Sequence, residues 1–513
     1  MIMSSKTRER PPTGLQLTEM ALLLLAGAFS CAPAPENPKA AAESISGRPN
    51  IIFIMDDQHR WDAIGNLHGE VITPTLDSLM EHGVLYDQAV CQAPMCVPSR
   101  NSIMFGMYPS QTGVFRNSGG VSDDSLPGKT MAQYFRDAGY ETAGFGKTHW
   151  GKYPTDTRGF ETRYTSEIPE EGGLTMAKLA PAAKARYDAE IASMGPGEEN
   201  NVGYLGFTSR LPEEDHRDGW INARAIEYIR GREDDRPLFL YLSYMKPHAG
   251  HNVPAGYEAR YDTAKITYAE QPLWREDRSV HAAGVNRRDL YESYWKRASP
   301  VEWKLMTMRY YANVTWIDDL MGRTLAALRE KGLLDNALIV YTSDHGESLG
   351  ERYYRFNKYS LYESSVRVPL IISGSGRSIG AEPGSVDRRP VDLVDLLPTL
   401  LREAGILPAA GLPGVDLLDD PARAGSFAAL HEREGEAAFM WRTPEAKLIL
   451  VFQRREDPAD YTAADIIGGE FYDLTEDPRE WEDRYGSPEV AGLTTDFQAR
   501  ILSRLHEMQR PGR

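Results

Sequence analysis

The sequence predicts an α/β protein with one large domain and a smaller C-terminal one. Apolar runs at 50–55, 237–243 and 337–342 each lead into polar or charged residues, as expected of buried strands in a largely parallel sheet. Apolar residues at helical spacing over 314–328 predict a core-facing helix between the second and third runs. After the turn-rich segment 405–421, short strand patterns and a final helix predict a small antiparallel sheet with a helix packed on it.

The remaining elements follow from the same periodicity rules. We expect a loop-rich, peripheral insertion over 154–219, and an aromatic- and charge-rich loop region over 253–300. The side chains of that loop region suit a sugar ring, with an ordinary solvated surface as the alternative. That region contains Trp274, Arg275, His281, Arg287 and Arg288. In chain order the other expected elements are a helix opening at Thr73, a helical piece near 178–193, a helix over 221–229, a helix over 391–401, strands near 437–442 and 447–452, and a helix over 494–508.

Length and composition are those of an ordinary soluble globular protein. The chain has 513 residues, of which 41% are hydrophobic and 26% charged, so it can bury a sizeable core. Its net charge is 57 − 74 = −17, which argues against a nucleic-acid partner. An anionic substrate would have to be attracted by a local cluster of basic residues, because the overall field opposes it.

The N-terminus resembles a bacterial export signal. Residues 1–30 combine a basic start with an apolar segment over 21–29 that is too short for an ordinary membrane span. The order Ala28-Phe29-Ser30-Cys31 resembles a lipobox, in which Cys31 would carry the lipid; a plain cleaved signal is the alternative. Residues 31–48 read as a flexible tether. We therefore expect a periplasmic or outer-membrane lipoprotein, or a secreted protein, with membrane contact only through the anchor.

Acidic residues follow two of the predicted buried strands. Asp56 and Asp57 follow the first strand, and Asp344 and His345 follow the third. Ligands of such sheets bind at the carboxyl ends of the strands, so these side chains predict a site for a hard cation. The oxygen-rich set favours calcium or magnesium over zinc.

Cys96 opens the most informative stretch of the chain. Pro98 biases Val97 away from helical conformation, so the segment reads as a loop that presents Cys96 and then turns into a helix. The amides of that helix start, together with Arg100, would favour an anion beside Cys96. Cys96 is therefore a candidate nucleophile, with a buried structural cysteine as the alternative.

The same stretch resembles the C-x-P-S-R…G signature of the type I sulfatases, which belong to the alkaline-phosphatase-like superfamily. The matching residues are Cys96, Pro98, Ser99, Arg100 and Gly106, while Phe105 replaces the usual threonine. The resemblance runs from about Asn50 to the C-terminus. It implies a large mixed sheet between helices in a catalytic domain at 49–410, and a C-terminal subdomain at 411–513. It also implies that Cys96 becomes formylglycine through a formylglycine-generating or anaerobic sulfatase-maturating enzyme, which leaves Cys91 as a free thiol.

Three further strings extend the resemblance. Gly146-Lys147-Thr148-His149 is similar to the family's G-K-x-H, which implies that Lys147 and His149 face the formylglycine and the sulfate. Pro247-His248 resembles a P-H segment whose histidine contacts the sulfate or the leaving oxygen. Lys358 stands where the family has a sulfate-binding lysine, with Arg355 as the rival.

The metal ligands implied by the resemblance complete the predicted site. Ser343-Asp344-His345-Gly346 resembles the S-D-H-G of the iduronate-2-sulfatase-like branch. The implied ligands are Asp56, Asp57, Asp344, His345 and the converted Cys96, with calcium as the cation and magnesium as the alternative. The residues implied to be catalytic are Cys96, Arg100, Lys147, His149, His248 and Lys358.

Sulfate ester hydrolysis is the activity that these residues predict. Hydrated formylglycine offers one hydroxyl for attack on sulfur and a second for release of the sulfate. The expected substrate is a sulfated carbohydrate, although small esters such as choline sulfate would also fit. Two alternatives stay open: a phosphatase, phosphodiesterase or phosphonate monoester hydrolase of the same superfamily, and a non-catalytic glycan-binding lipoprotein.

Overall fold

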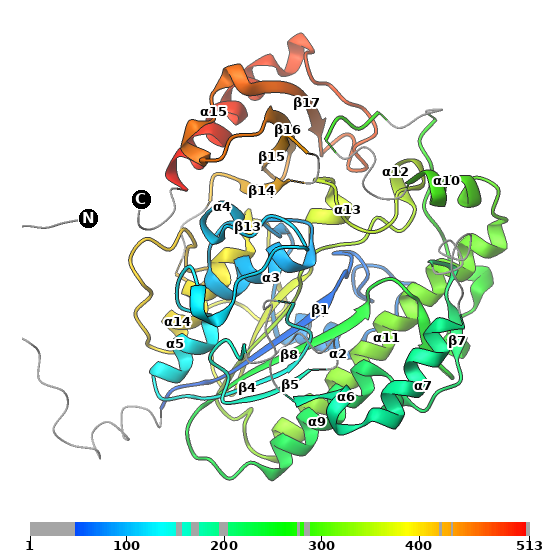
Figure 1. Cartoon of the computed structure of the whole chain (residues 1–513), viewed down its shortest axis with the longest axis vertical. Coiled ribbons are helices and arrows are strands. Elements are labelled where there is room, and N and C mark those ends of the chain that lie inside the picture. The colour runs from blue at the N-terminus through cyan, green and yellow to red at the C-terminus, as the bar shows by residue number, and fades with distance from the viewer. Residues whose placement is uncertain are drawn as a thin grey trace, which may run out of the picture. The chain divides into compact units, whose positions relative to one another are not determined.

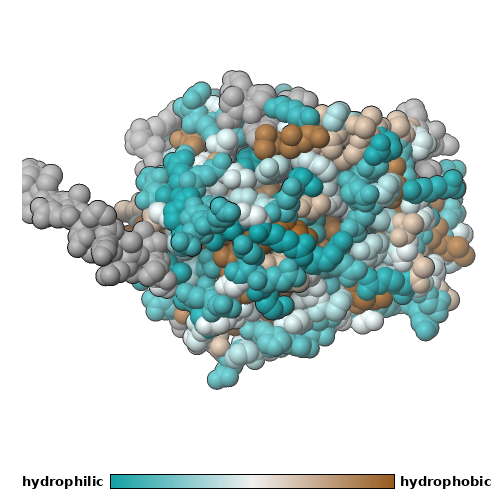
Figure 2. Space-filling view, turned by 90° about the horizontal axis from the view of Figure 1, so that it is seen from below, coloured by the Kyte–Doolittle hydropathy of each residue, from teal (hydrophilic) through white to brown (hydrophobic). Residues whose placement is uncertain are grey.

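The computed structural model describes residues 47–149, 156–165, 174–193, 204–273, 278–281, 288–419, 423–431 and 434–508. The predicted export signal, the lipobox and most of the tether lie outside the described residues, as do Trp274, Arg275 and Arg287. Among the helices of the described residues, none carries an apolar stretch of the length needed to span a bilayer. The face shown in Figure 2 is mostly hydrophilic, with small separate apolar patches.

A nine-stranded mixed sheet forms the centre of the larger part, as predicted (Figure 1). The strand order is β12-β2-β11-β10-β1-β8-β4-β5-β6. The three predicted buried strands are neighbours within it and run parallel, β1 lying between β10 and β8. The strands are β1 (Asn50–Asp57), β2 (Gly83–Tyr86), β4 (Glu141–Gly146), β5 (Thr162–Thr165), β6 (Leu174–Thr175), β8 (Leu238–Pro247), β10 (Ala337–Ser343), β11 (Leu370–Ser375) and β12 (Ser385–Asp387).

Helices cover both faces of this sheet, because its central strands are apolar on both sides. In β1, Ile51 and Phe53 belong to one core cluster, whereas Ile52 and Ile54 belong to the other. The first core lies under α3 (Cys96–Phe105), α5 (Met131–Asp137) and α14 (Leu396–Glu403). The second lies under α2 (Pro74–His82), α9 (Arg217–Gly231) and α11 (Pro300–Glu330).

The C-terminal part is a four-stranded antiparallel sheet with one helix, again as predicted. Its elements are β14 (Ser426–Leu430), β15 (Glu436–Arg442), β16 (Ala446–Gln453), β17 (Ile466–Asp473) and α15 (Ala491–Glu507). One face, including Met440 and Ile449, joins the core under α3. The other face packs against α15, where Phe439 and Ile501 share a core. The boundary between 410 and 411 stays a prediction.

Two local predictions were wrong, and one helix is longer than predicted. Residues 391–392 form β13 (Val391–Asp392), paired with β3 (Ala89–Val90). A 3-10 turn over Leu393–Asp395 follows, capped by a bond from the Asp392 backbone to Asp395 at 3.0 Å, and α14 begins at Leu396. The region 253–300 contains α10 (Arg288–Trp295), whose Trp295 is buried against Trp303. The helix expected over 314–328 begins at Pro300 because Ser299 and Glu302 form a capping box.

Shorter elements complete the described chain. They are α4 (Pro109–Thr112), α6 (Met176–Leu179), α7 (Pro181–Ala192), β7 (Phe207–Ser209), β9 (Asn252–Pro254), α12 (Glu351–Tyr354) and α13 (Glu363–Val366).

Candidate active site

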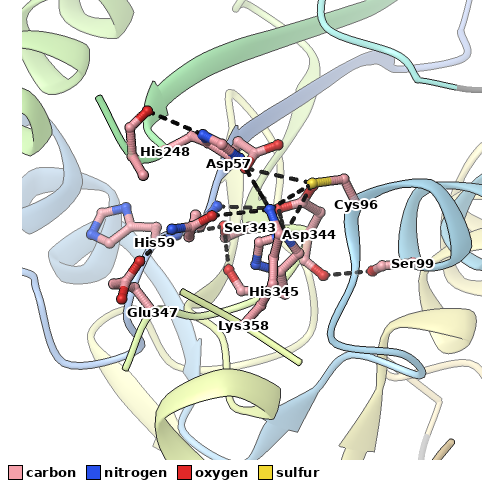
Figure 3. Close-up of polar contacts among 12 residues, drawn as sticks. Asp57, His59, Cys96, Ser99, His248, Ser343, Asp344, His345, Glu347 and Lys358 are labelled. Carbon is pink, nitrogen blue, oxygen red and sulfur yellow. Dashed lines mark hydrogen bonds and ion pairs between the residues drawn. The ribbon is translucent and has the colours of Figure 1, made fainter. Parts of the chain in front are cut away.

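Polar side chains converge at the carboxyl ends of four neighbouring parallel strands. Asp57 ends β1, Asp344 follows β10, Lys147 follows β4 and His248 follows β8. Cys96 reaches the same place from the first residue of α3 (Figure 3). This is the position at which α/β sheets bind their ligands.

Cys96 lies among cationic and ligating groups. Its Sγ is 3.0 Å from Lys358 Nζ, 3.3 Å from His345 Nε2, and 3.9 Å from both Lys147 Nζ and Asp57 Oδ1. The side chain is buried, and the predicted loop-to-helix turn places it there: Met95 is extended and α3 begins at Cys96. Gly106 ends this helix with φ +62, a left-handed conformation that favours glycine.

The surroundings of Cys96 stabilise negative charge. Burial alone would raise the pKa of its thiol, but Lys147, Lys358 and His345, with a hydrogen bond from His149, hold that pKa well below the usual value. In an enzyme that carries formylglycine, the sulfur stands in for the oxygens of that residue. Lys147 and Lys358 would then face a developing oxyanion.

Arg100 holds the two carboxylates together. Its fully buried guanidinium donates to Asp344 Oδ2 at 2.6 Å and to Asp57 Oδ2 at 3.1 Å, and a third bond reaches the Lys147 carbonyl at 2.9 Å. Lys147 Nζ approaches Asp57 Oδ2 at 2.7 Å. Burial and Cys96 would raise the pKa of Asp57, but Lys147, His248 and Lys358 lower it below the usual value. In this geometry, Arg100 positions the acidic groups.

Four of the predicted ligands form a set that suits a divalent cation. One ligand atom from each of Asp57, Cys96, Asp344 and His345 lies within 4.8 Å of the others, and all four residues are buried. His345 Nδ1 lies 3.0 Å from the Gly346 carbonyl, to which it can only donate, so loss of the Nε2 proton would leave a lone pair on Nε2 for a cation. Burial raises the pKa of Asp344 to about 6, although Arg100 opposes the shift. A bound divalent cation would offset the cost of burying the charged Asp344 carboxylate. This set of residues therefore fits a metal ion.

Asp56 lies outside that set. Its Oδ2 accepts from Tyr341 at 2.7 Å and is 2.6 Å from His59 Nδ1. Its Oδ1 is buried and has no hydrogen-bond partner among the described residues. Consecutive residues of a strand point to opposite faces, which explains why Asp56 and Asp57 separate. The assignment of Asp56 as a ligand stays a prediction.

Lys358 connects the cysteine to His248. Its Nζ is 3.0 Å from each of three acceptors: Cys96 Sγ, His248 Nε2 and Gln58 Oε1. A lysine ammonium only donates, so His248 Nε2 accepts, and burial together with Lys358 lowers the pKa of His248 to about 4. His248 keeps 28% of its side chain exposed, which puts it at the entrance. The rival Arg355 lies instead over the ring of Tyr362, at 5.6 Å.

Three residues at the site were missed by sequence reasoning. Gln58 accepts from Lys358 and donates to Glu347, and Glu347 also accepts from the backbone of Asn357 at 2.6 Å. Gln58 directly follows the Asp56-Asp57 pair, and Glu347 directly follows the Ser343-Asp344-His345-Gly346 motif. This adjacency to predicted site residues is the sequence feature that could have identified them. Asn117 accepts from the Val97 backbone at 3.1 Å, beside the cysteine. No spacing pattern marks Asn117.

His281, which we expected in a sugar-binding loop region, has a structural place instead. It is buried, its Nδ1 is 2.8 Å from Glu470 Oε1, and its Nε2 accepts from the Leu361 backbone at 2.9 Å. Both nitrogens are therefore occupied within the protein.

Comparison with known proteins identifies the family. The sequence model of the sulfatase family matches residues 49–406, more than half of the chain. The chain belongs to the sulfatase family. An arylsulfatase of Clostridium perfringens is 30% identical over 395 residues, covering 72% of this chain and 78% of that protein. The protein is thus a sulfatase enzyme, and its family implies a metal ion and a formylglycine.

Solved structures show the same fold. A phosphonate monoester hydrolase from Silicibacter pomeroyi aligns with a TM-score of 0.69 at 23% identity, covering 89% of this sulfatase and 95% of that chain. A protein solved with its substrate D-glucosamine-2-N,6-O-disulfate aligns with a TM-score of 0.68 at 22% identity, covering 90% and 98%. The assignment to the iduronate-2-sulfatase-like branch stays a prediction.

Proposed function

We propose that this sulfatase removes sulfate from a sulfated carbohydrate, using a formylglycine made from Cys96 and a bound calcium ion, with magnesium as the alternative. The observation that carries the proposal is the surroundings of Cys96 Sγ. Ligand atoms of Asp57, Asp344 and His345 lie within 4.8 Å of it, and Lys358 Nζ and Lys147 Nζ approach it at 3.0 and 3.9 Å. Such a site suits a tetrahedral oxyanion attached to residue 96.

Asp57, Asp344, His345 and residue 96 would hold the cation, with Asp56 as the further predicted ligand. When bound, the cation supplies positive charge that stabilises the sulfuryl oxygens. The aldehyde of residue 96, once formed and hydrated, supplies one hydroxyl to take up the sulfuryl group and a second to release it. Arg100 keeps Asp57 and Asp344 in place through its paired hydrogen bonds.

Lys358 and His248 form the proton-carrying pair for the leaving alcohol. Lys358 is protonated at rest, because Cys96 and Asp57 raise its pKa despite burial, and its Nζ already donates to His248 Nε2. His248, whose pKa is lowered to about 4, accepts this bond and orients the ammonium, so Lys358 is the group that gives its proton to the leaving alcohol, with His248 as the alternative donor. His149, hydrogen-bonded to residue 96, is placed to remove a proton from the second hydroxyl.

Support for a carbohydrate substrate comes from the comparisons and the sequence. The structural neighbour solved with a disulfated glucosamine shares the fold over 90% of this chain. The predicted export as a lipoprotein would place the enzyme where extracellular glycans arrive. The proposal also requires a maturating enzyme in the host, because an unconverted cysteine lacks the second hydroxyl.

The fold similarity to a phosphonate monoester hydrolase favours one second candidate function, hydrolysis of phosphorus esters. Paired rates on 4-nitrophenyl sulfate, 4-nitrophenyl phosphate and a phenylphosphonate monoester separate the two, because the leaving alcohol is closely matched. We expect kcat/KM to be highest for the sulfate. A preference for either phosphorus ester would overturn the proposal.

The substrate class is tested by sulfate release, measured by ion chromatography. Suitable probes are hexasaccharides of heparin, chondroitin sulfate, ulvan and ι-carrageenan, with choline sulfate beside them. We expect release from at least one sulfated hexasaccharide at a higher kcat/KM than from choline sulfate. Release from choline sulfate alone would exclude the carbohydrate proposal while leaving the sulfatase chemistry intact.

A further inference from the structure

Glu347 is a buried carboxylate to which the mechanism above gives no role. It lies two residues after His345, its side chain is fully shielded from solvent, and Figure 3 shows it at the margin of the site. Burying a carboxylate without a cationic partner is costly, so its place here requires an explanation. In the described part of the chain, the donors to this carboxylate are all uncharged: Gln58, the backbone amides of Leu349 and Asn357, and the Tyr204 hydroxyl at 3.5 Å.

One oxygen of Glu347 holds the backbone that carries Lys358. Its Oε1 accepts from the amide of Asn357 at 2.6 Å and from that of Leu349 at 2.7 Å. Asn357 directly precedes Lys358 and has a φ of +72°, a left-handed conformation that residues other than glycine seldom adopt. Such a conformation persists only where the surrounding contacts enforce it. Glu347 therefore helps to fix the point from which the Lys358 side chain starts.

The other oxygen of Glu347 sets the orientation of the Gln58 amide. Gln58 Nε2 donates to Glu347 Oε2, and Gln58 Oε1 accepts from Lys358 Nζ at 3.0 Å. A carboxylate only accepts and an ammonium only donates, so the amide fits between them in one orientation. The reverse orientation would place its NH2 group against the ammonium and its oxygen against the carboxylate. Glu347 therefore keeps an acceptor turned towards Lys358.

The direction of the Lys358 ammonium depends on that acceptor. Its three N–H groups face Gln58 Oε1, Cys96 Sγ and His248 Nε2, each at 3.0 Å. Cys96 and His248 belong to the reacting centre, whereas Gln58 is fully buried. When a substrate takes the place of a contact at the reacting centre, the bond to Gln58 still holds the ammonium. Displacing a reacting group by about 1 Å can cost about a hundredfold in rate.

We propose that Glu347 is the positioning residue of Lys358, which it holds at two points: at the ammonium through the Gln58 amide, and at the start of the side chain through the Asn357 backbone. The inference rests on the proposed function and deepens it, since Lys358 is there the proton donor to the leaving alcohol. Glu347 itself belongs neither to the ligand set nor to the groups around Cys96 Sγ. Its effect on rate grows with the basicity of the leaving alcohol, because a basic leaving group needs a well-placed proton donor.

The decisive variant is Glu347→Gln, which keeps the size of the side chain. The new amide oxygen can still accept from the two backbone amides, but its NH2 group now faces Gln58, so the acceptor turned towards Lys358 is lost. The ratio of kcat/KM for 4-methoxyphenyl sulfate to that for 4-nitrophenyl sulfate should fall about tenfold, because methoxyphenol is the more basic leaving group. Glu351→Gln is the matched control, since this carboxylate lies on the same segment and pairs with Arg60 at 2.7 Å. It should leave the ratio unchanged.

An exchange of the two groups tests the hydrogen bonds themselves. Glu347→Gln combined with Gln58→Glu restores the match of donors and acceptors, because the carboxylate at position 58 accepts from the amide at position 347 and from Lys358 Nζ. We expect this double variant to recover most of the lost ratio. A merely structural role of Glu347 predicts no recovery, since the two substitutions would then add their losses. If Glu347→Gln does not fold, Gln58→Met removes the same acceptor and should lower the ratio about tenfold.

Crystal structures of the variants separate this inference from the proposed function, because they need no turnover. Lys358 Nζ should move away from residue 58 in Glu347→Gln and return in the double variant. An unmoved Nζ, an unchanged ratio in either single variant, or a double variant no better than the single one would overturn the positioning role. Absence of sulfate release from every ester by the wild type, with Nζ displaced in Glu347→Gln, would instead overturn the proposed function alone.

Discussion

Two buried groups of charged side chains in this sulfatase are built on opposite principles. The structural ion-pair cluster consists of Glu363, Arg442, Lys447 and Glu480, where α13 meets the C-terminal sheet. Arg442 donates to both Glu363 oxygens at 2.7 Å, and Lys447 lies 2.7 Å from both Glu363 and Glu480. Two acids thus meet two bases, and each charge is matched within the protein.

The catalytic cluster of Asp57, Arg100, Lys147, Asp344 and Lys358 is not balanced in this way. Ligand atoms of Asp57, Asp344 and His345 face one another, and Lys358 donates to a sulfur and a histidine instead of a carboxylate. Burial raises the pKa of Asp344, whereas the neighbouring cations lower that of Asp57. In the structural cluster, each charged side chain is paired with an opposite charge of the protein, and the cluster stabilises the fold. In the catalytic cluster, the carboxylates can still bind a cation and the lysines can still bind an oxyanion, as catalysis requires.

The largest effect should come from the centre of the catalytic cluster. Cys96→Ala removes the precursor of the formylglycine, so kcat should fall by more than about a thousandfold. The fold should persist, because the change removes one buried sulfur. Turnover of 4-nitrophenyl sulfate and the circular dichroism spectrum check the two expectations. Near-native turnover would contradict the role of residue 96.

A second prediction separates the adjacent aspartates. Asp57→Asn should lower both bound calcium, measured by plasma mass spectrometry, and kcat/KM about a hundredfold, because Asp57 belongs to the ligand set. Asp56→Asn should cost less than about tenfold, because Asp56 Oδ2 bonds to Tyr341 and His59 and only Oδ1 is available to the cation. An unchanged calcium content in Asp56→Asn would remove Asp56 from the ligand set, and an unchanged content in Asp57→Asn would contradict the proposed metal site.

A substitution in the structural ion-pair cluster should lower the free energy of unfolding and leave turnover nearly unchanged. Arg442→Met leaves Glu363 with Lys447 and a longer contact of 3.8 Å to Arg367, and the loss of its bidentate buried partner should lower the free energy of unfolding by about 3–5 kcal/mol. Turnover per folded molecule should change less than about threefold, because Arg442 contacts no residue of the catalytic cluster in the described structure. Denaturant unfolding and kinetics on the same preparation measure both. A loss of turnover with an unchanged free energy of unfolding would contradict the assignment of this cluster to fold stability.

The smallest expected effect is a pH dependence at His431. Burial, with Arg454 and Arg116, lowers the pKa of His431 to about 3 from the 6.5 of an exposed histidine. Between these values the unfolded chain binds a proton that the folded protein does not, so stability falls as pH decreases from about 6.5 towards 3. His431→Phe should remove this component. The melting temperature of the variant relative to the wild type should therefore rise as the pH falls from 7 to 5. A constant difference would mean that the pKa of His431 is the same in the folded protein and in the unfolded chain.

Sequence patterns predicted the central strands and most of the site because both rest on local rules. A continuous apolar run such as 51–55 can only be buried on both faces, and the residues after it must lie at the sheet edge. Lys147, His248, Asp344 and Lys358 were found in this way and through family resemblance. Gln58 and Glu347 escaped because their roles depend on a side-chain contact across 289 positions of sequence. The extended start of the predicted helix over 391–401 escaped because its strand pairing with Ala89–Val90 is non-local.

The most direct test of the central claim is the mass of the peptide that contains Cys96, from protein purified from its native host. Conversion of the cysteine to formylglycine lowers the mass by about 18 Da, since the thiol gives way to an aldehyde. Our account predicts this loss, together with reaction of the peptide with a hydrazide. An unmodified Cys96 thiol in protein that still hydrolyses sulfate esters would contradict it.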